Sequence, residues 1–342
     1  MSAPTSAPVD AHALATWLTA EGVLPAGGCV DVEPLTGGSS NPTYRVRGGG
    51  VDLVLRRPPA RGGLPTAHDM EREYRFQAAL ADTPVPVAGM VALCRDVDVI
   101  GAPFYVMDRL DGVVYARADA VGALPTPVAA EAGLALARTL AALHAVDPVS
   151  VGLGHYGRPD PYAVRQLRRW GRQWTASGPE SVPLVARVLA ALTARVPDAG
   201  PERIVHGDYN LANVMYRRDR PDRVLAVLDW EMAALGAPEA DLGQLLAYWG
   251  PAGRLLFAER GGHLPDANPA LPTRDDLVAA YNAASAREPR SVPFWEAFAA
   301  IKLAIICAGA LRRVADSSSE RVTRIEELVA GLAAIARDTL EV

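Results

Sequence analysis

The apolar positions in the first third of the chain predict a small antiparallel sheet. Short apolar runs at 30–35, 43–47 and 51–56 are separated by small-residue turns, which is the pattern of neighbouring strands joined by tight connections. Two later runs, at 90–94 and from Phe104 onward, are typical of further strands. We therefore expect about five strands before the composition of the chain changes near Gly112.

Helical periodicity appears twice among these strands. Asp10 can cap a helix that runs to about Ala20. A second helix is expected to begin near Thr66, with Asp69 at the spacing of a capping box, and to end near Leu80. The inward stripe expected for this second helix consists of Met70, Tyr74, Gln77 and Leu80 or Ala81.

Glu73 lies on the side of that stripe, next to Met70 and Tyr74. A carboxylate on an otherwise buried face requires a cation, and Arg56 at the end of the third strand is the candidate. An ordinary surface position for Glu73 is the alternative.

Beyond Gly112 the chain is mainly helical, with three short strand pieces in its middle. Apolar runs at 203–205, 214–216 and 224–228 predict those strands. Helix-forming segments are predicted at 128–144, 162–174, 183–196, 240–246, 273–286, 293–313 and 318–338. The pattern indicates an α+β chain of two lobes, and a length of 342 residues is sufficient for both.

The loop between the first two of these strand pieces carries the candidate chemistry. Asp208 is followed five residues later by Asn213, and Asp229 comes directly after the next strand. One carboxylate to accept the proton of an attacking hydroxyl, with an amide oxygen and a second carboxylate to hold Mg²⁺, is the arrangement that phosphoryl transfer from a nucleotide requires. The alternative is that each residue only caps or begins a turn.

Composition narrows the class of protein. Half of the residues are apolar and the formal net charge is −5, so we expect a soluble globular protein without affinity for nucleic acid or membranes. Cys29, Cys94 and Cys307 form neither a disulfide framework nor a zinc motif. The tail 1–8 does not have the pattern of a signal peptide, and the apolar stretch 297–311 is expected to be too short for a bilayer. A cytoplasmic location is the expectation.

The motif His206-Gly207-Asp208, with Asn213 and then Asp229-Trp230-Glu231, resembles the aminoglycoside phosphotransferase family of small-molecule kinases. The resemblance implies a protein-kinase-like bilobal fold, in which a small lobe contains an antiparallel sheet plus a helix and a large lobe is mainly helical. It divides the chain into a nucleotide-binding lobe at 1–107, a hinge at 108–112 and a helical lobe at 113–342 that holds the catalytic and metal loops. ATP or GTP with Mg²⁺ is the implied cofactor set.

The resemblance also assigns the nucleotide-binding residues. Arg56 takes the position of the usual phosphate-binding lysine, and an arginine keeps the positive charge of that lysine. The chain offers no lysine for this role. In the hinge, the carbonyl of Asp108 and the amide of Leu110 would contact adenine. The small-residue turn that would approach the phosphates comprises Gly38, Ser39 and Ser40. A simple turn, a solvated strand end and a plain edge strand are the alternatives for these three features.

Support for the catalytic loop is assigned in the same way. His206 would brace the loop, and Asp241 would hold its backbone, although Asp241 also has the position of a helix N-cap. Several segments are similar to the branch of the family that occurs fused to acyl-CoA dehydrogenases, which favours a metabolite alcohol as the acceptor.

The acceptor is expected to be neutral or anionic, and a hydroxyacyl compound is one candidate. One helix of the large lobe carries four arginines, where a polycationic antibiotic would call for carboxylates. These arginines are Arg165, Arg168, Arg169 and Arg172. The alternatives are a catalytically inactive nucleotide-binding scaffold and a true aminoglycoside kinase, and the sequence does not determine the oligomeric state.

Overall fold

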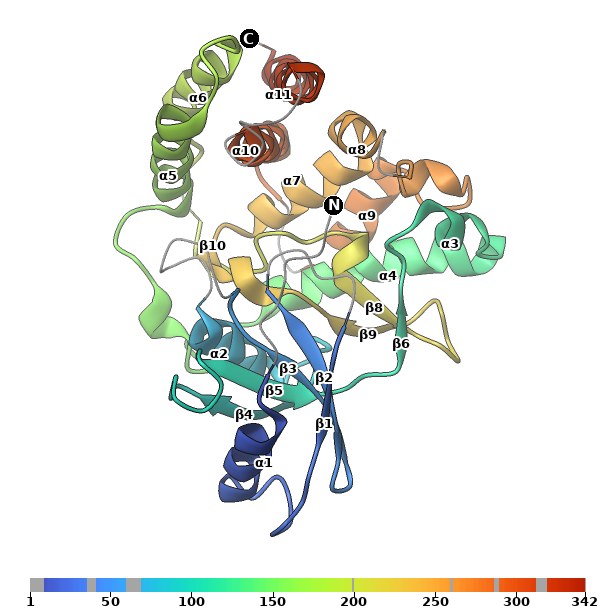
Figure 1. Cartoon of the computed structure of the whole chain (residues 1–342). Coiled ribbons are helices and arrows are strands. Elements are labelled where there is room, and N and C mark those ends of the chain that lie inside the picture. Colours follow the sequence, from blue (N-terminus) through green and yellow to red (C-terminus); the bar gives the residue numbers. More distant parts are fainter. Residues whose placement is uncertain are drawn as a thin grey trace. The chain divides into compact units, whose positions relative to one another are not determined.

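The computed structural model describes residues 9–35, 41–59, 69–198, 200–258, 261–285, 289–311 and 319–341. Three expectations fall outside these ranges: the tail 1–8, the turn formed by Gly38, Ser39 and Ser40, and the helix start near Thr66. The chain forms two compact units (Figure 1). Unit 1 comprises Met1–Gly112 together with Leu225–Ala233, and unit 2 comprises Val113–Val224 together with Ala234–Val342.

Unit 1 is built on a five-stranded antiparallel sheet with the strand order β1-β2-β3-β5-β4 (Figure 1). Its strands are β1 (Asp31–Pro34), β2 (Thr43–Gly48), β3 (Val51–Arg56), β4 (Met90–Cys94) and β5 (Phe104–Asp108). The tight β2–β3 connection depends on three consecutive glycines, Gly48, Gly49 and Gly50, because all three have a positive φ. The strands predicted from the apolar runs are present.

Two helices accompany this sheet. Helix α1 (Ala11–Ala20) begins as predicted after Asp10, whose carboxylate accepts hydrogen bonds from two backbone amides. Leu14 and Leu18 of α1 belong to the apolar core formed with the strands. Helix α2 (Met70–Leu80) begins at Met70 with Asp69 itself as the N-cap, so the predicted start was several residues too early.

The buried stripe of α2 differs from the predicted one in that Phe76 takes the place of Tyr74, while Glu73 lies on the side where it was expected. Phe76 and Glu73 are fully buried, whereas Tyr74 is only half-buried. The prediction followed a spacing of four and then three residues, and the helix presents Met70, Glu73 and Phe76 at a spacing of three. The carboxylate of Glu73 therefore points into the interior of unit 1.

Unit 2 is mainly helical, as the sequence indicated (Figure 1). Its helices are α3 (Ala118–Gly122), α4 (Thr126–Ala145), α5 (Tyr162–Ser177), α6 (Leu184–Ala194), α7 (Pro238–Trp249), α8 (Pro251–Phe257), α9 (Arg274–Ala284), α10 (Val292–Leu311) and α11 (Ser319–Leu340). Short α3 and α8 were not predicted. Helix α9 starts at a capping box in which Thr273 and Asp276 each accept a hydrogen bond from the other's backbone.

Short strands carry the candidate catalytic loop. Strand β7 (Arg203–Val205) pairs antiparallel with β10 (Ala234–Gly236), and β8 (Val214–Arg217) follows the loop. The remaining short strands are β6 (Gly112–Val114) and β9 (Val224–Val227).

Helix α10 lies in the core of unit 2, beside α7 and α11. Its window Val292–Gly309 has the length and apolar composition of a membrane-spanning helix, so the expectation that this stretch is too short was wrong. The apolar stretch 297–311, on which that expectation rested, left out the first turn of the helix. Because 72% of the window is buried inside the protein, its apolar character is accounted for by packing.

The crossing of α7 and α10 depends on one glycine. A Cβ atom on Gly243 would lie 2.5 Å from the backbone carbonyl carbon of Trp295. Real side chains do not approach a backbone so closely. The absence of a side chain at this position therefore sets the separation of the two helices.

Candidate active site

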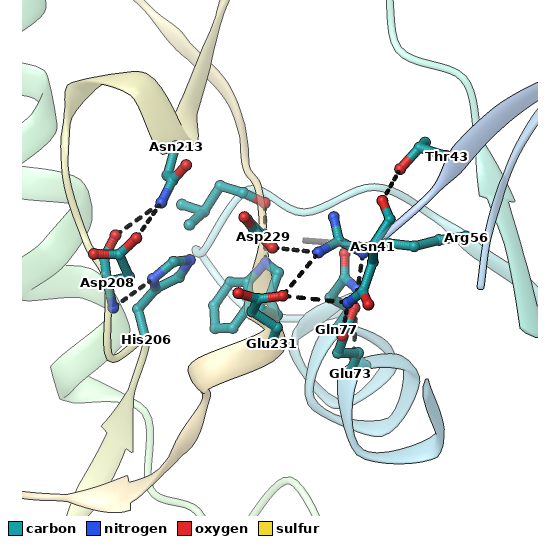
Figure 2. Close-up of polar contacts among 12 residues, drawn as sticks. Asn41, Thr43, Arg56, Glu73, Gln77, His206, Asp208, Asn213, Asp229 and Glu231 are labelled. Atoms are coloured by element: carbon teal, nitrogen blue, oxygen red, sulfur yellow. Dashed lines mark hydrogen bonds and ion pairs between the residues drawn. The ribbon is translucent and has the colours of Figure 1, made fainter. Parts of the chain in front are cut away.

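The loop between β7 and β8 presents Asp208 through a network of short-range hydrogen bonds, drawn in Figure 2. His206 is buried, and its Nδ1 accepts a hydrogen bond of 3.2 Å from the backbone amide of Asp208. Asn213 donates through Nδ2 to the Asp208 carbonyl at 2.9 Å and to its carboxylate Oδ2 at 3.2 Å. The structure thus brings together the three residues predicted to form the catalytic loop.

Asp241 holds the backbone of this loop. Its Oδ2 accepts from the amide of His206 at 2.6 Å, and its Oδ1 accepts from the amide of Gly207 at 2.8 Å. Helix α7 begins at Pro238, so the alternative role of Asp241 as an N-cap is wrong. Burial raises the pKa of Asp241, but the neighbouring His144 and His206 outweigh that effect and the pKa is lowered. The bracing carboxylate is therefore ionised.

Two buried tyrosines anchor the same loop to α4. The hydroxyl of Tyr209 donates to the carbonyl of Leu136, and the hydroxyl of Tyr216 donates to the carbonyl of Ala132, each at 2.9 Å. Both rings are fully buried. The polar tips of these large core residues thereby fix the chain that follows Asp208.

A cavity of about 330 Å³ lies in unit 2 and shares Tyr248 with the contacts of Asp208. Tyr248 connects the two, since it lines the cavity and its hydroxyl donates to Asp208 Oδ1 at 3.1 Å. Other walls of the cavity are formed by Asn210, Leu211, Trp249, Phe257, His263 and Leu264. The sequence did not identify Tyr248 as the partner of Asp208.

In unit 1, Arg56 lies at the centre of a cluster of carboxylates (Figure 2). Its Nε is 3.1 Å from Glu73 Oε2, its Nη2 contacts Asp229, and the same nitrogen is 3.6 Å from Glu231 Oε2. The predicted pairing of Arg56 with Glu73 is confirmed. The participation of Glu231 was not predicted.

Neutral polar groups complete this cluster. The carboxamide of Asn41 donates to Glu73 at 3.0 Å and to Glu231 at 3.2 Å, and the hydroxyl of Tyr105 donates to Glu73 at 3.0 Å. Asp229 begins the following turn with a φ of 62°, a left-handed conformation that is uncommon for aspartate. The 229–231 segment is thus held in a specific orientation toward Arg56.

The charges in this cluster do not balance, because Arg56 contacts three carboxylates and the second guanidinium nearby, that of Arg72, donates to the carbonyl of Glu231 at 2.7 Å. Burial raises the pKa of Glu73 to about 7, and the carboxylates of Asp229 and Glu231 act in the same direction, against the attraction of Arg56. The pKa of Arg56 is raised by its acidic neighbours despite burial. The cluster therefore has excess negative charge when all three acids are ionised.

Replacing Glu73 with glutamine should change how stability depends on pH. The folded pKa of about 7 lies above the ordinary value of 4.5, so the folded state binds more protons between these values. The stabilising contribution of Glu73 is complete below the ordinary value and is lost as pH rises through about 7. Relative to the native protein, Glu73→Gln should therefore gain stability from about pH 5 to about pH 8 in thermal unfolding without nucleotide.

Glu71 on the exposed side of the same helix provides the matched control. Hydrogen bonds from Arg95 and Arg75 lower the pKa of Glu71 to about 2, so it does not titrate in this range. Glu71→Gln should differ from the native protein by a constant amount. A constant difference for Glu73→Gln as well would contradict the assignment.

The remaining predicted site residues fall into three cases. Asp108 ends β5 and its amide donates to the carbonyl of Gly89 at 2.8 Å, while the adenine-binding roles of the Asp108 carbonyl and the Leu110 amide stay predictions. The phosphate-binding turn lies outside the described residues. That Asp208 and Asn213 of unit 2 act together with Asp229 and Arg56 of unit 1 stays a prediction from the sequence motif.

The arginines of α5 are not all available to a ligand. Arg165 pairs with Glu202 at 2.8 Å and donates to the carbonyl of Leu235 at 2.9 Å. Arg168 pairs with Asp160 at 2.6 Å. Both side chains therefore have structural partners, which reduces the positive charge that α5 offers to an anionic acceptor.

Comparison with known proteins adds a family relationship. The family model described as Phosphotransferase enzyme family matches residues 31–277. Acyl-CoA dehydrogenase family member 11 from Mus musculus is 36% identical over 290 residues, covering 83% of this chain and 37% of that protein. The chain thus spans little more than a third of the length of this curated relative.

Two solved structures extend the comparison. A candidate aminoglycoside phosphotransferase from Ralstonia eutropha JMP134 is 33% identical with a TM-score of 0.82, covering 98% of this chain and 99% of that chain. Aminoglycoside phosphotransferase APH(4)-Ia, in complex with AMP-PNP and hygromycin B, is 15% identical with a TM-score of 0.62, covering 95% and 98%. The second likeness concerns the fold alone, and together they confirm the predicted α+β protein-kinase-like fold.

Proposed function

The chain belongs to the phosphotransferase enzyme family, and from this premise we propose that it transfers the terminal phosphoryl group of ATP or GTP to a hydroxyl of a small molecule. One observation carries the proposal: the Asp208 carboxylate is oriented by Asn213 and by Tyr248, and Tyr248 also lines a cavity. A carboxylate fixed in this way can accept a hydrogen bond from an alcohol that enters the cavity.

In this proposal Asp208 is the base that orients the acceptor hydroxyl and receives its proton. The backbone on either side of Asp208 is held by His206 and Asn213, so its carboxylate has little freedom to turn away. Asp241 contributes indirectly, through the amides of His206 and Gly207. Phosphoryl transfer depends mainly on positioning and charge, and these contacts supply the positioning.

The proposed metal ligands are Asn213 and Asp229. Both hydrogen bonds that the Asn213 carboxamide makes to described residues come from Nδ2, so its oxygen is available as a ligand. Mg²⁺ prefers such hard oxygen donors, and its charge would offset the excess of carboxylates around Arg56. When bound, Mg²⁺ neutralises charge on the phosphate oxygens.

Protein side chains alone would not complete this coordination. Among the described residues, no group of three His, Cys, Asp or Glu side chains has the arrangement of a metal site. This fits the usual binding of Mg²⁺ through one or two protein ligands together with phosphate oxygens and water.

Arg56 is the proposed contact for the nucleotide phosphates. Its guanidinium is fixed by Glu73 as the equivalent lysine is in a kinase, and the planar fork can bind phosphate oxygens in a bidentate manner. The same geometry supports a second candidate function. Asp229 and Glu231 also contact Arg56, so its positive charge is already paired with carboxylates of the protein. This arrangement would suit a scaffold that binds nucleotide without turnover.

The cavity supports a neutral or anionic acceptor with an apolar portion, and a hydroxyacyl thioester is one candidate. Aromatic and aliphatic side chains form most of its wall. Among the described residues of the wall, the one carboxylate belongs to Asp119, which is paired with Arg117 at 2.6 Å. A polycationic aminoglycoside would require several unpaired carboxylates.

A screen for nucleotide-dependent turnover tests the proposal. ADP or GDP release with Mg²⁺ should appear with a hydroxyacyl thioester or a related alcohol, and amino sugars should give at least about tenfold lower kcat/KM, as an unfavourable charge match predicts. Thermal shift with each compound separates binding from turnover. Turnover of an amino sugar at about 10⁴ M⁻¹s⁻¹ or more would contradict the acceptor class. Nucleotide binding without turnover on any compound would support the scaffold.

A further inference from the structure

Lys302 is the only lysine among 34 basic residues. It lies in the middle of α10 and is buried, with 7% of its surface exposed. A chain that uses arginine at every other basic position has retained a lysine where a side chain enters the core. The difference between the two residues is physical, because lysine is a compact point charge on a flexible stem and arginine is a broad planar fork.

The ammonium group of Lys302 contacts the catalytic loop. Its Nζ donates to the backbone carbonyl of Gly207 and, at 3.1 Å, to Oε1 of Gln244. Gln244 is buried, and its Nε2 has no hydrogen-bond partner among the described residues. The contact with Lys302 is therefore what orients the Gln244 carboxamide.

The carbonyl of Gly207 and the amide of Asp208 belong to the same peptide group. Lys302 binds the carbonyl end, and Nδ1 of His206 accepts from the amide end. A peptide group is planar, so holding both ends fixes the orientation of the whole plane. The direction in which the Asp208 side chain leaves the backbone follows from that plane. Gly207 itself has a φ of 84°, a conformation that glycine adopts without a steric penalty.

Charge adds to this geometric role. Asp208 and Asp241 are the carboxylates near Lys302, and Arg169 of α5 is the nearby cation. Burial lowers the pKa of Lys302, and Arg169 acts in the same direction, while both aspartates oppose them. A protonated ammonium next to Asp208 stabilises the carboxylate form of the base.

We propose that Lys302 is a positioning residue for phosphoryl transfer, which fixes the peptide group between Gly207 and Asp208 and places a positive charge beside the base. The inference rests on the proposed function. The inference goes beyond the proposed function by assigning a role to α10, a helix that the catalytic motif does not include.

Lys302→Met tests the role, since methionine retains the stem and removes the charge and the donors. The kcat should fall by about 10- to 100-fold, the effect of misplacing a catalytic group, with nucleotide affinity unchanged. Hydrogen–deuterium exchange should become faster at the amides of 206–213 and remain unchanged in unit 1.

Glu296→Gln is the matched control in the same helix. Glu296 is buried and pairs with the partly exposed Arg274 at 2.5 Å, so the substitution removes a buried carboxylate charge from α10 without touching the loop. It should lower Tm and leave both kcat and exchange at 206–213 unchanged. If the two variants lose kcat in the same proportion to their loss of Tm, the inference is overturned and Lys302 has a purely structural role.

Lys302→Arg provides a third measurement. Because arginine keeps the charge but replaces the compact ammonium with a broad planar fork, kcat should fall in this variant although the charge remains. A native kcat in Lys302→Arg would overturn the inference. If the native protein has no turnover, the proposed function fails, but hydrogen–deuterium exchange still tests the role of Lys302. Unchanged protection of 206–213 in Lys302→Met would overturn that role. Faster exchange confined to the loop would support it.

Discussion

Replacing Asp208 with asparagine should lower kcat by about 10²- to 10⁴-fold, the range that removal of a positioned general base produces. The amide has the same shape as the carboxylate but cannot accept the proton of the acceptor hydroxyl. Nucleotide affinity should change little, because the residues proposed to contact the phosphates are in unit 1. Steady-state kinetics and calorimetry on the same preparation measure both quantities.

Asp219→Asn is the control for this substitution. Asp219 is exposed and pairs with Arg217 in the turn after β8, so it shares the chemistry of Asp208 without its position. The control should retain full activity. Residual turnover within about threefold of the native value in Asp208→Asn would exclude a base role for this residue.

Replacing Arg56 with methionine should weaken nucleotide binding by about 3 kcal/mol or more, since it leaves buried carboxylates without their cation. Unit 1 should also lose stability for the same reason. In the double variant Arg56→Met with Glu73→Gln, stability should partly return because one uncompensated charge is removed, whereas nucleotide affinity should remain low. Calorimetry with ATP and GTP, together with Tm, separates the two effects.

Arg45→Met serves as the comparison. Arg45 lies on neighbouring β2 and pairs with Asp52 at the surface, where a charge pair contributes little. Its affinity for nucleotide should match that of the native protein. If Arg56→Met also binds nucleotide with native affinity, the assignment of Arg56 to the phosphates is wrong.

The secondary structure could be predicted largely from local patterns. Apolar alternation located the strands of unit 1, and the cap at Asp10 located α1, because both signals depend on adjacent residues. The start of α2 was misplaced because Asp69 has the chemistry of an N-cap as well as of a capping-box partner, and only its backbone distinguishes the two roles. The register of its buried stripe depends on packing against the sheet, which a single helix does not reveal.

The site could be predicted only in part. The contact of Arg56 with Glu73 was predicted because a carboxylate on a buried face implies a cation. Glu231, Tyr248 and Lys302 were missed as site residues because they reach their partners across long separations in sequence. A signal for Lys302 was present nonetheless, since it is the single lysine in an arginine-rich chain.

The crossing of α7 and α10 has a consequence for protein engineering. Asp241 and Gln244 are on α7 and Lys302 is on α10, so the spacing set by Gly243 determines whether the supports of the catalytic loop reach their partners. A combinatorial library aimed at new acceptors can vary the cavity wall apart from Tyr248, which contacts Asp208, and should keep position 243 invariant. Substitutions that change the acceptor are therefore expected to be tolerated in the cavity wall of unit 2, whereas no side chain is expected to be tolerated at Gly243.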